Sequence, residues 1–269
     1  MQKTIFITGA SSGLGKSTAK LFQSKGWRVI ATMRNPNKET ELNQLKDVVV
    51  LPLDVTDEKQ IIATINEVTS KYEIDVVMNN AGYGLIGVLE SLDDEMIQRQ
   101  ISTNLLSVIR ISKGFVSHFR ERGTGTFVNI TSTFGLIGFP TCSIYSATKF
   151  AIDGFSESMA YELAQFGIQV KVIAPGGMQT DFASRSMEVG QHEAYEKLSA
   201  EVSKGYSAEK VAQYTKVEDV AEIVYNATTD NTSQFRYIAG NDAIGLYNER
   251  TTIGAEKQVQ NIKSMFAFN

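Results

Sequence analysis

Short apolar runs alternate with longer helix-like segments along most of the chain, and this alternation constrains the fold more than any other feature. The apolar runs are rich in β-branched residues and lack polar alternation, as expected for strands that are buried on both faces of a parallel sheet. Strands are expected at 3–8, 27–33, 48–55, 74–82, 125–132, 168–176 and 235–240, and helices near 13–25, 58–71, 143–166 and 217–227. Because crossovers between parallel strands are right-handed, the pattern predicts an α/β fold with a doubly wound parallel sheet and helices on both faces.

The bulk properties predict a single soluble domain that spans residues 1–269. The net charge of -4 argues against nucleic acid as a partner, because nucleic-acid-binding proteins normally carry a basic face. The single cysteine, Cys142, allows no internal disulfide and indicates a reducing compartment. We also expect no signal peptide, and no stretch approaches the ~18 apolar residues of a transmembrane helix. These features predict a cytoplasmic protein that has no membrane partner.

Residues from about 179 to 205 interrupt the alternation. The segment is polar, has few strand-like runs and directly follows the strand that ends in Ala174-Pro175-Gly176-Gly177. Long excursions in compact domains are often functional. We therefore expect short helices that form a mobile cover over a site, with an ordinary surface insertion as the alternative. The residues from 241 onward are mixed in character, and their pattern favours no particular structure.

The stretch TGASSGLGKS, residues 8–17, joins the first strand to the first helix and has the glycine content of a phosphate-binding turn. A P-loop that binds a nucleoside triphosphate requires G-x-x-x-x-G-K-[ST]. Counting back five residues from Gly15 gives Ala10, so the match fails at its first glycine. Lys16 and Ser17 are therefore interpreted as ordinary residues of the first helical turn.

A dinucleotide-binding turn is the second interpretation of the same stretch, and it uses Gly9, Gly13 and Gly15 in the pattern T-G-x-x-x-G-x-G. Glycine permits tight backbone conformations and lets a pyrophosphate approach the backbone amides. The helix N-terminus adds partial positive charge. The pattern favours a dinucleotide cofactor, and a plain strand-to-helix turn is the alternative for this segment alone.

The end of the second strand indicates which dinucleotide is bound. NAD-specific sites usually place a carboxylate there, which bonds the ribose hydroxyls, but this strand ends Thr32-Met33-Arg34-Asn35. The guanidinium of Arg34 suits a 2′-phosphate, which an aspartate would repel. Ser11 or Ser12 can add a hydroxyl contact. The sequence therefore favours NADP(H) over NAD, with a solvated surface arginine as the alternative for Arg34.

Tyr145 and Lys149 lie four residues apart, so a helix places the phenol and the ammonium on one face, one turn apart. This pair alone is a weak signal. Ser132, however, closes the strand at 125–132, at the carboxyl edge where open α/β sheets carry their chemistry. Asn104 lies in a helix-like segment, where a buried amide needs hydrogen-bonding partners. We predict that these four side chains form one catalytic site.

With these features in place, the chain resembles the short-chain dehydrogenases/reductases, in the form with a TGxxxGxG cofactor turn and a YxxxK active site. The resemblance runs from Lys3 to about Asp181. The matching elements are residues 8–15, Asp54-Val55-Thr56, Asn79-Asn80-Ala81-Gly82, Asn104, Ser132, Tyr145 with Lys149, and Pro175-Gly176. The stretches NNAGYGLIG and YSATKFAIDGFSESMAYEL also resemble the branch that contains 17-beta-hydroxysteroid and retinol dehydrogenases. The resemblance implies a Rossmann-type fold and nicotinamide-dependent interconversion of a secondary alcohol with a ketone or aldehyde.

The resemblance also implies a role for each catalytic residue. Tyr145 would be the general acid in reduction and the general base in oxidation. A free phenol titrates at about 10, and Lys149, with the oxidised nicotinamide nearby, is expected to lower that pKa. Lys149 would also bond the nicotinamide ribose. Ser132 would bond the substrate oxygen, and Asn104 would hold a water that links Lys149 to solvent.

The cofactor contacts implied by the resemblance come from several parts of the chain. They are Gly9, Ser11, Ser12, Gly13, Leu14, Gly15, Arg34, Asp54, Val55, Asn80, Ala81, Gly82, Tyr145, Lys149, Pro175, Gly176, Met178 and Thr180. Asp54 would bond the adenine amino group, or it could instead cap the helix that begins near residue 58. Asn79 is expected to make a structural bond. Asp181 belongs to a T-D-x turn of the family or caps the segment that follows.

Apolar residues gather around the expected pocket and indicate a hydrophobic or aromatic substrate. They are Leu85, Ile86, Phe134, Leu136, Ile137, Phe139, Met178 and Phe182. The expected substrate contacts are Ser132, Phe134, Tyr145 and Phe182. Phe134 marks a departure from the family, because a second serine is frequent after Ser132, and its ring would narrow the pocket or pack against the substrate.

Cysteine and histidine give no sign of further chemistry. Cys142 has no histidine partner and is expected to be an ordinary small residue. His118 and His192 lack the spacing of metal ligands, so we expect surface histidines and no metal site.

The resulting hypothesis is an NADP(H)-dependent alcohol dehydrogenase or carbonyl reductase that acts on a small apolar carbonyl compound. An NADP(H)-binding sensor without turnover is the alternative, although a sensor has no need of Ser132, Tyr145 and Lys149. Members of the family are commonly dimers or tetramers through the helices near Asn104 and Tyr145. The resemblance therefore implies a homo-oligomer, unless the apolar faces of those helices only pack on the sheet.

Overall fold

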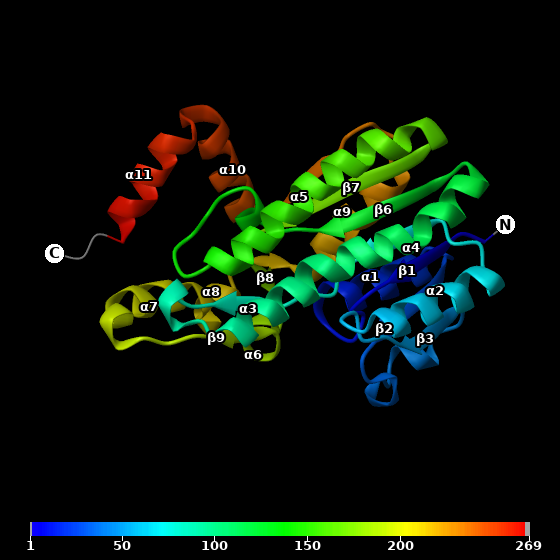
Figure 1. Cartoon of the computed structure of the whole chain (residues 1–269), viewed down its shortest axis with the longest axis horizontal. Coiled ribbons are helices and arrows are strands. Elements are labelled where there is room, and N and C mark those ends of the chain that lie inside the picture. Colours follow the sequence, from blue (N-terminus) through cyan, green and yellow to red (C-terminus); the bar gives the residue numbers. More distant parts are fainter. Residues whose placement is uncertain (1, 267–269) are drawn as a thin grey trace.

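The computed structural model describes residues 2–266 and is built around one seven-stranded sheet (Figure 1). Its strands are β1 (Thr4–Ile7), β2 (Arg28–Met33), β3 (Val48–Pro52), β4 (Val76–Asn79), β6 (Gly125–Ile130), β7 (Ile168–Pro175) and β11 (Arg236–Ala239). All neighbouring strands are parallel, in the order β11-β7-β6-β4-β1-β2-β3. The chain winds outward from β1 on one side and from β4 on the other. The predicted doubly wound sheet is therefore confirmed, and its switch point lies between β1 and β4.

Helices cover both faces of the sheet, and each face has its own buried apolar cluster (Figure 1). The main helices are α1 (Gly13–Ser24), α2 (Glu58–Lys71), α3 (Asp94–Ile101), α4 (Ser107–Arg122), α5 (Ser143–Leu163) and α9 (Val217–Thr229). Phe22 of α1 and Val224 of α9 belong to the cluster on one face. Ile65 of α2, Phe115 of α4 and Met159 of α5 belong to the cluster on the other. Burial of these apolar stripes is the main force that holds the layers together.

The segment after β7 contains the short helices that the sequence predicts. Its elements are β8 (Met178–Gln179), α6 (Phe182–Arg185), β9 (Met187–Val189), α7 (Glu196–Ser203), α8 (Ala208–Val211) and β10 (Thr215–Lys216). Strand β8 pairs with β10, and β9 pairs with β5 (Gly84–Ile86), which follows β4. The β8–β10 pair therefore joins the two ends of the segment, and the β5–β9 pair ties it to the chain that follows β4.

The chain beyond residue 241, where the sequence favours no structure, forms two helices, α10 (Asn241–Ile253) and α11 (Ala255–Met265). Gly254 joins them with a φ of 82°, a conformation that favours glycine. Gln258 on α11 donates from Nε2 to the Leu246 carbonyl (2.8 Å) and to the Glu249 carboxylate (3.0 Å) on α10. The resulting hairpin projects from the body of the molecule toward the α7 side (Figure 1). None of the helices in the described chain combines the length and apolar character that a membrane span needs.

The start of α1 yields a test of the fold. A Cβ at Gly15 would lie 2.5 Å from Asn80 Nδ2 and 2.5 Å from the Gly9 carbonyl oxygen, whereas one at Gly245 in α10 would meet nothing within 4 Å. Gly15→Ala should therefore lower the free energy of unfolding by about 1–3 kcal/mol. Gly245→Ala should raise it by about 0.5–1 kcal/mol, because alanine is the better helix former. Urea unfolding measures both values, and a stabilised Gly15→Ala protein would contradict the packing described here.

Candidate active site

Hydrogen bonds between two loops form the base of the site, where the carboxyl ends of β1 and β4 meet. The Thr8 hydroxyl oxygen accepts from the backbone N–H groups of Asn80 and Ala81, both at 3.0 Å. Asn80 Nδ2 donates to the Thr8 and Gly9 carbonyls at 2.9 and 3.1 Å. The structure thus brings the glycine-rich turn and the Asn80-Ala81-Gly82 stretch together, as predicted. Thr8 was absent from the predicted contacts, although its place before Gly9 in the motif is the signal for it.

The glycine-rich turn leaves the N-terminus of α1 open to a ligand. Gly9 and Gly13 have φ values of 67° and 52°. Ser12, the N-cap residue, makes no side-chain cap bond, and the first turn contains no acidic residue. A Cβ at Gly13 would meet only the Thr180 side chain, at 3.9 Å. Unsatisfied amides, the positive end of the helix dipole and open space fit the pyrophosphate of a dinucleotide.

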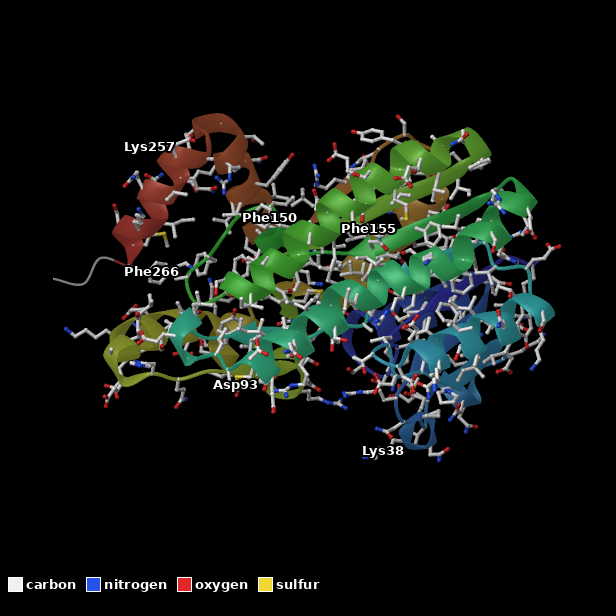
Figure 2. All side chains as sticks on the ribbon, viewed as in Figure 1. Lys38, Asp93, Phe150, Phe155, Lys257 and Phe266 are labelled. Atoms are coloured by element: carbon white, nitrogen blue, oxygen red, sulfur yellow. The ribbon has the colours of Figure 1, made fainter. Side chains whose placement is uncertain are left out.

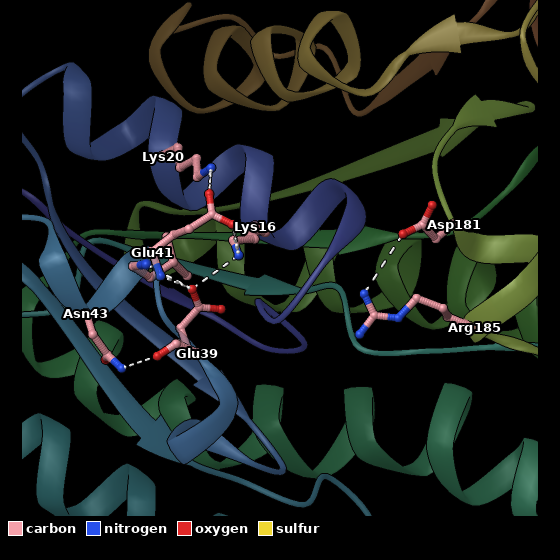
Figure 3. Close-up of polar contacts among 8 residues, drawn as sticks. Lys16, Lys20, Glu39, Glu41, Asn43, Asp181 and Arg185 are labelled. Atoms are coloured by element: carbon pink, nitrogen blue, oxygen red, sulfur yellow. Dashed lines mark hydrogen bonds and ion pairs between the residues drawn. The ribbon is translucent and has the colours of Figure 1, made fainter.

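The loop after β2 supplies the charges at the expected adenosine end. Lys16 Nζ lies 3.1 Å from a carboxylate oxygen of Glu39 and 2.7 Å from one of Glu41, and Lys20 also pairs with Glu41 (Figure 3). Lys16 is thus a structural helix residue, as expected. Arg34 is exposed at the end of β2 and forms no ion pair within residues 2–266. Its guanidinium is therefore the cation available directly at the end of β2, whereas Lys38 and Lys46 lie farther along the loop.

Asp54 and Asn79 each had two possible roles in the sequence, and their hydrogen bonds distinguish between them. Asp54 Oδ1 accepts from the backbone N–H and the hydroxyl of Thr56 at 2.9 and 2.7 Å, within a turn. Asp57, and not Asp54, caps α2, so the capping alternative for Asp54 is wrong. Asn79 Nδ2 donates to Asn129 Oδ1 at 2.8 Å in the buried sheet, which confirms its structural role.

Three of the four predicted catalytic residues meet beyond the end of β6. Ser132 caps the one-turn helix Thr133–Gly135, and its hydroxyl oxygen accepts from the Phe134 N–H at 3.1 Å. The Ser132 and Tyr145 side chains share a hydrogen bond. Lys149 Nζ donates to the Ile130 carbonyl at 2.9 Å and lies 5.7 Å from the centroid of the Tyr145 ring. The hydroxyl, phenol and ammonium therefore lie close together, with Ser132 and Lys149 buried and Tyr145 half-buried.

The fourth residue, Asn104, lies in the π-helical turn Ser102–Leu106 between α3 and α4. Such turns often mark functional sites. Asn104 Oδ1 accepts from the Tyr83 N–H at 3.0 Å, and Nδ2 donates to the Tyr83 carbonyl at 2.8 Å. A Cβ at Gly82 would lie 3.1 Å from Asn104 Oδ1 and 3.8 Å from Lys149 Nζ. Asn104 and Lys149 therefore converge on Gly82, and the sequence contained no pattern that singled out Tyr83.

Burial controls the protonation of the site. It raises the pKa of Tyr145 to about 12, which the hydrogen bond from Ser132 only partly offsets. It lowers the pKa of Lys149 to about 8. The expected lowering of the Tyr145 pKa is therefore not achieved by the chain's own groups, because desolvation outweighs the effect of Ser132. At neutral pH the phenol keeps its proton and is a donor.

Cys142, His118 and His192 make structural contacts. Cys142 is fully buried, and burial raises the pKa of its thiol to about 12, as expected for an unreactive residue. His118 is half-buried, and its Nε2 accepts from the Ile74 N–H at 3.1 Å. His192 is partly exposed and accepts from the Ala194 N–H.

The predicted substrate contacts lie at two places around the site. Phe134 is half-buried beside Ser132 and stacks on Phe139, with ring centroids 5.0 Å apart. Phe182 on α6 covers Gly84, where a Cβ would lie 3.2 Å from its ring. The other apolar side chains differ in exposure. Leu85 and Ile137 are fully buried in the body, Ile86 is nearly so, and Leu136 and Met178 are half-buried.

Sequence comparisons place the chain among known proteins. A family model described as short chain dehydrogenase matches residues 3–190. The chain is 34% identical over 249 residues to the oxidoreductase BOA17 of Botryotinia fuckeliana, covering 91% of each chain. It is 36% identical over 195 residues to a 3-ketodihydrosphingosine reductase of Bacteroides thetaiotaomicron, covering 71% of each. It is 33% identical over 195 residues to retinol dehydrogenase 8 of Bos taurus, covering 69% of this chain and 62% of that one.

Solved structures agree with this placement. A short-chain dehydrogenase from Streptomyces avermitilis has a TM-score of 0.86 at 27% identity, covering 98% of each chain. ElxO with NADP bound has a TM-score of 0.74 at 29% identity, covering 89% of this chain and 96% of that one. Fold, site geometry and relatives therefore lead to one conclusion: the chain belongs to the short-chain dehydrogenase/reductase family, the oxidoreductases that act on CH–OH groups.

Proposed function

We propose that the protein is an NADP(H)-dependent carbonyl reductase that converts an apolar ketone or aldehyde to the alcohol, and catalyses the reverse reaction in principle. The observation that carries this proposal is the meeting of Ser132, Tyr145 and Lys149 beyond the end of β6, where the lysine ammonium lies 5.7 Å from the centroid of the Tyr145 ring. A sensor without turnover would gain nothing from a desolvated proton donor held beside a hydroxyl and an ammonium.

The cofactor would lie along the carboxyl edge of the sheet. Gly9, Ser11, Ser12, Gly13, Leu14 and Gly15 would hold the pyrophosphate at the open N-terminus of α1. Asp54 and Val55 would contact the adenine, and Asn80, Ala81 and Gly82 its ribose. Pro175, Gly176, Met178 and Thr180 would border the nicotinamide, whose ribose Tyr145 and Lys149 would contact. Bound NADPH supplies the hydride that forms the new C–H bond.

The chain's own residues handle the proton and orient the substrate. The Tyr145 hydroxyl donates its proton to the carbonyl oxygen as the carbonyl carbon gains its hydrogen, so the C=O double bond becomes an alcohol. Ser132 bonds the same oxygen and stabilises its developing charge. Lys149 and Asn104, which converge on Gly82, would return a proton to Tyr145 through a water. A pKa of about 12 keeps Tyr145 protonated at neutral pH, which is the form that reduction requires.

Arg34 supports NADP(H) over NAD. It is the exposed cation at the end of β2, while Lys16 and Lys20 are occupied by Glu39 and Glu41 (Figure 3). No carboxylate from the end of β2 opposes a 2′-phosphate there. NADP in the related ElxO structure is consistent with this preference.

Aromatic side chains support an apolar substrate. Phe134 and Phe139 form a stacked pair directly beside Ser132. Two relatives are named for 3-ketodihydrosphingosine and for retinol, and both compounds carry their oxygen function on a hydrocarbon framework. Residues 179–205 would cover the bound substrate as a lid, with Phe182 on its inner side.

The outer surface of α5 supports a homo-oligomer. Phe150 (Figure 2) and Tyr161 on this helix leave 44% and 74% of their surface exposed, and Phe166 just after it leaves 36%. Leu106, in the turn that precedes α4, leaves 37%. Exposed apolar side chains in such a row indicate a covered surface. We assign this face to contact with a second copy of the chain.

Substitution of Arg34 tests the cofactor. Arg34→Ala should raise the Kd for NADPH by about 10–100-fold, the loss expected for hydrogen bonds to a charged group. The Kd for NADH should change less than about twofold, because NADH lacks the 2′-phosphate. Fluorescence titration measures both, and Lys38→Ala on the same exposed loop is the control. An unchanged preference would show that Arg34 points to solvent.

Substitution of Tyr145 tests the reaction. Tyr145→Phe should lower kcat for ketone reduction by about 10²–10⁴-fold, the usual contribution of a positioned proton donor, and leave NADPH binding nearly unchanged. Tyr161→Phe, on the exposed face of the same helix, should keep its activity. Loss of NADPH absorbance measures turnover. Normal kcat in Tyr145→Phe would refute the proposed role of the phenol.

The buried Lys149 should be visible in a pH titration. Burial lowers its pKa from 10.5 to about 8, so the unfolded chain binds more protons than the folded protein between these values. This group therefore makes the protein more stable as the pH rises from about 8 toward 10.5. NMR of ¹³C-labelled lysines should show one resonance, absent in Lys149→Met, that titrates near 8. The exposed Lys71, whose pKa is raised by Glu67, is the internal control. If Lys149 titrated in the same pH range as Lys71, the burial argument would be contradicted.

A further inference from the structure

A cavity of about 660 Å³ lies between the segment after β7 and the C-terminal hairpin. Its walls come from three separate parts of the chain: residues 193–198 at the start of α7, Ile262, Lys263 and Phe266 at the end of α11, and Pro140 before α5. The volume is within the range of small-molecule sites. None of the catalytic or cofactor residues described above lines it.

A row of aromatic rings connects this cavity to the catalytic residues. Phe134, whose N–H bonds Ser132, stacks on Phe139 with centroids 5.0 Å apart and planes 11° apart. Phe139 meets Phe266 edge-on at 5.5 Å. Phe266 lies at the end of α11 and lines the cavity (Figure 2). Three aromatic rings in contact therefore span the distance from the residue bonded to Ser132 to the cavity.

The lining separates apolar from charged groups. Ile262 is buried, and Tyr195, Leu198 and Phe266 are half-buried, so the inner surface is apolar. The charged members are all exposed and stand at the rim: Glu193, Glu196, Lys197 and Lys263. Two charges of each sign give the rim no net preference for an anion or a cation. A neutral apolar ligand matches these walls best.

We propose that this cavity binds the distal arm of the substrate, so that the enzyme acts on a long, neutral, largely hydrocarbon carbonyl compound and not on a compact ketone. This inference rests on the proposed function, because the reacting carbonyl would lie at Ser132 and Tyr145 while the arm follows Phe134 and Phe139 to Phe266. Each methylene buried in this way adds about fourfold to affinity.

The test compares two methyl ketones that share the reacting group, 2-butanone and 2-undecanone, with NADPH. The wild type should reduce 2-undecanone with a kcat/KM at least about tenfold higher. Phe139→Ala and Phe266→Ala should each lower the ratio of the two kcat/KM values by about tenfold. Leu198→Trp, which fills the cavity, should also lower the ratio of the two kcat/KM values. If one of the three variants fails to fold, the other two still test the proposal. Met265→Ala, next to Phe266 but 70% exposed, is the matched control and should keep the ratio.

Equal kcat/KM values for the two ketones in the wild type, or an unchanged ratio in all three cavity variants, would overturn the assignment. If neither ketone is reduced, the proposed reductase activity is refuted. Calorimetric titration of the NADPH-loaded protein with 2-undecanone then tests separately whether the cavity binds the hydrocarbon arm. Binding of 2-undecanone that Phe266→Ala weakens by about tenfold supports the arm site without turnover. Absence of binding overturns it.

Discussion

The contact between the glycine-rich turn and the end of β4 is the constraint on which the rest of the site depends. A Cβ at Gly9 would lie 2.8 Å from the Ala81 Cα, so only glycine permits this approach. The Thr8 hydroxyl and the Asn80 amide then join the two loops at the switch point of the sheet. Because the loops are joined there, the open N-terminus of α1 is held close to the stretch that leads to Gly82, where a Cβ would lie 3.8 Å from Lys149 Nζ.

Burial gives the catalytic group its chemical character. Tyr145 and Lys149 both shift toward their neutral forms, since desolvation dominates each pKa. A neutral phenol is a proton donor, whereas a phenolate would be needed for oxidation. The positive charge of an oxidised nicotinamide is the remaining influence that would favour the phenolate. The direction of the reaction would thus be coupled to the redox state of the cofactor at the site.

Two excursions from the Rossmann-type sheet build the proposed substrate site. The segment after β7 is held by the β8–β10 and β5–β9 pairs, and the α10–α11 hairpin is held by Gln258. The contact of Phe266 with Phe139 joins the hairpin to the loop that follows Ser132. In the proposed substrate site, the sheet would thus hold the reacting groups at its edge, and these two segments would set how long a molecule can lie beside them.

The sequence by itself determined whatever depends on short-range pattern: the order of strands and helices, the glycine turn, the one-turn spacing of Tyr145 and Lys149, and the place of Ser132 at a strand end. Local sterics and periodicity decide these features within a few residues. Tertiary structure alone decided the α10–α11 hairpin, the bonding of Asn104 to Tyr83, the half-buried position of His118 and the high pKa of Tyr145. Each of these depends on groups far apart in the sequence, because burial and hydrogen-bond partners are set by the packed fold and not by the neighbouring residues.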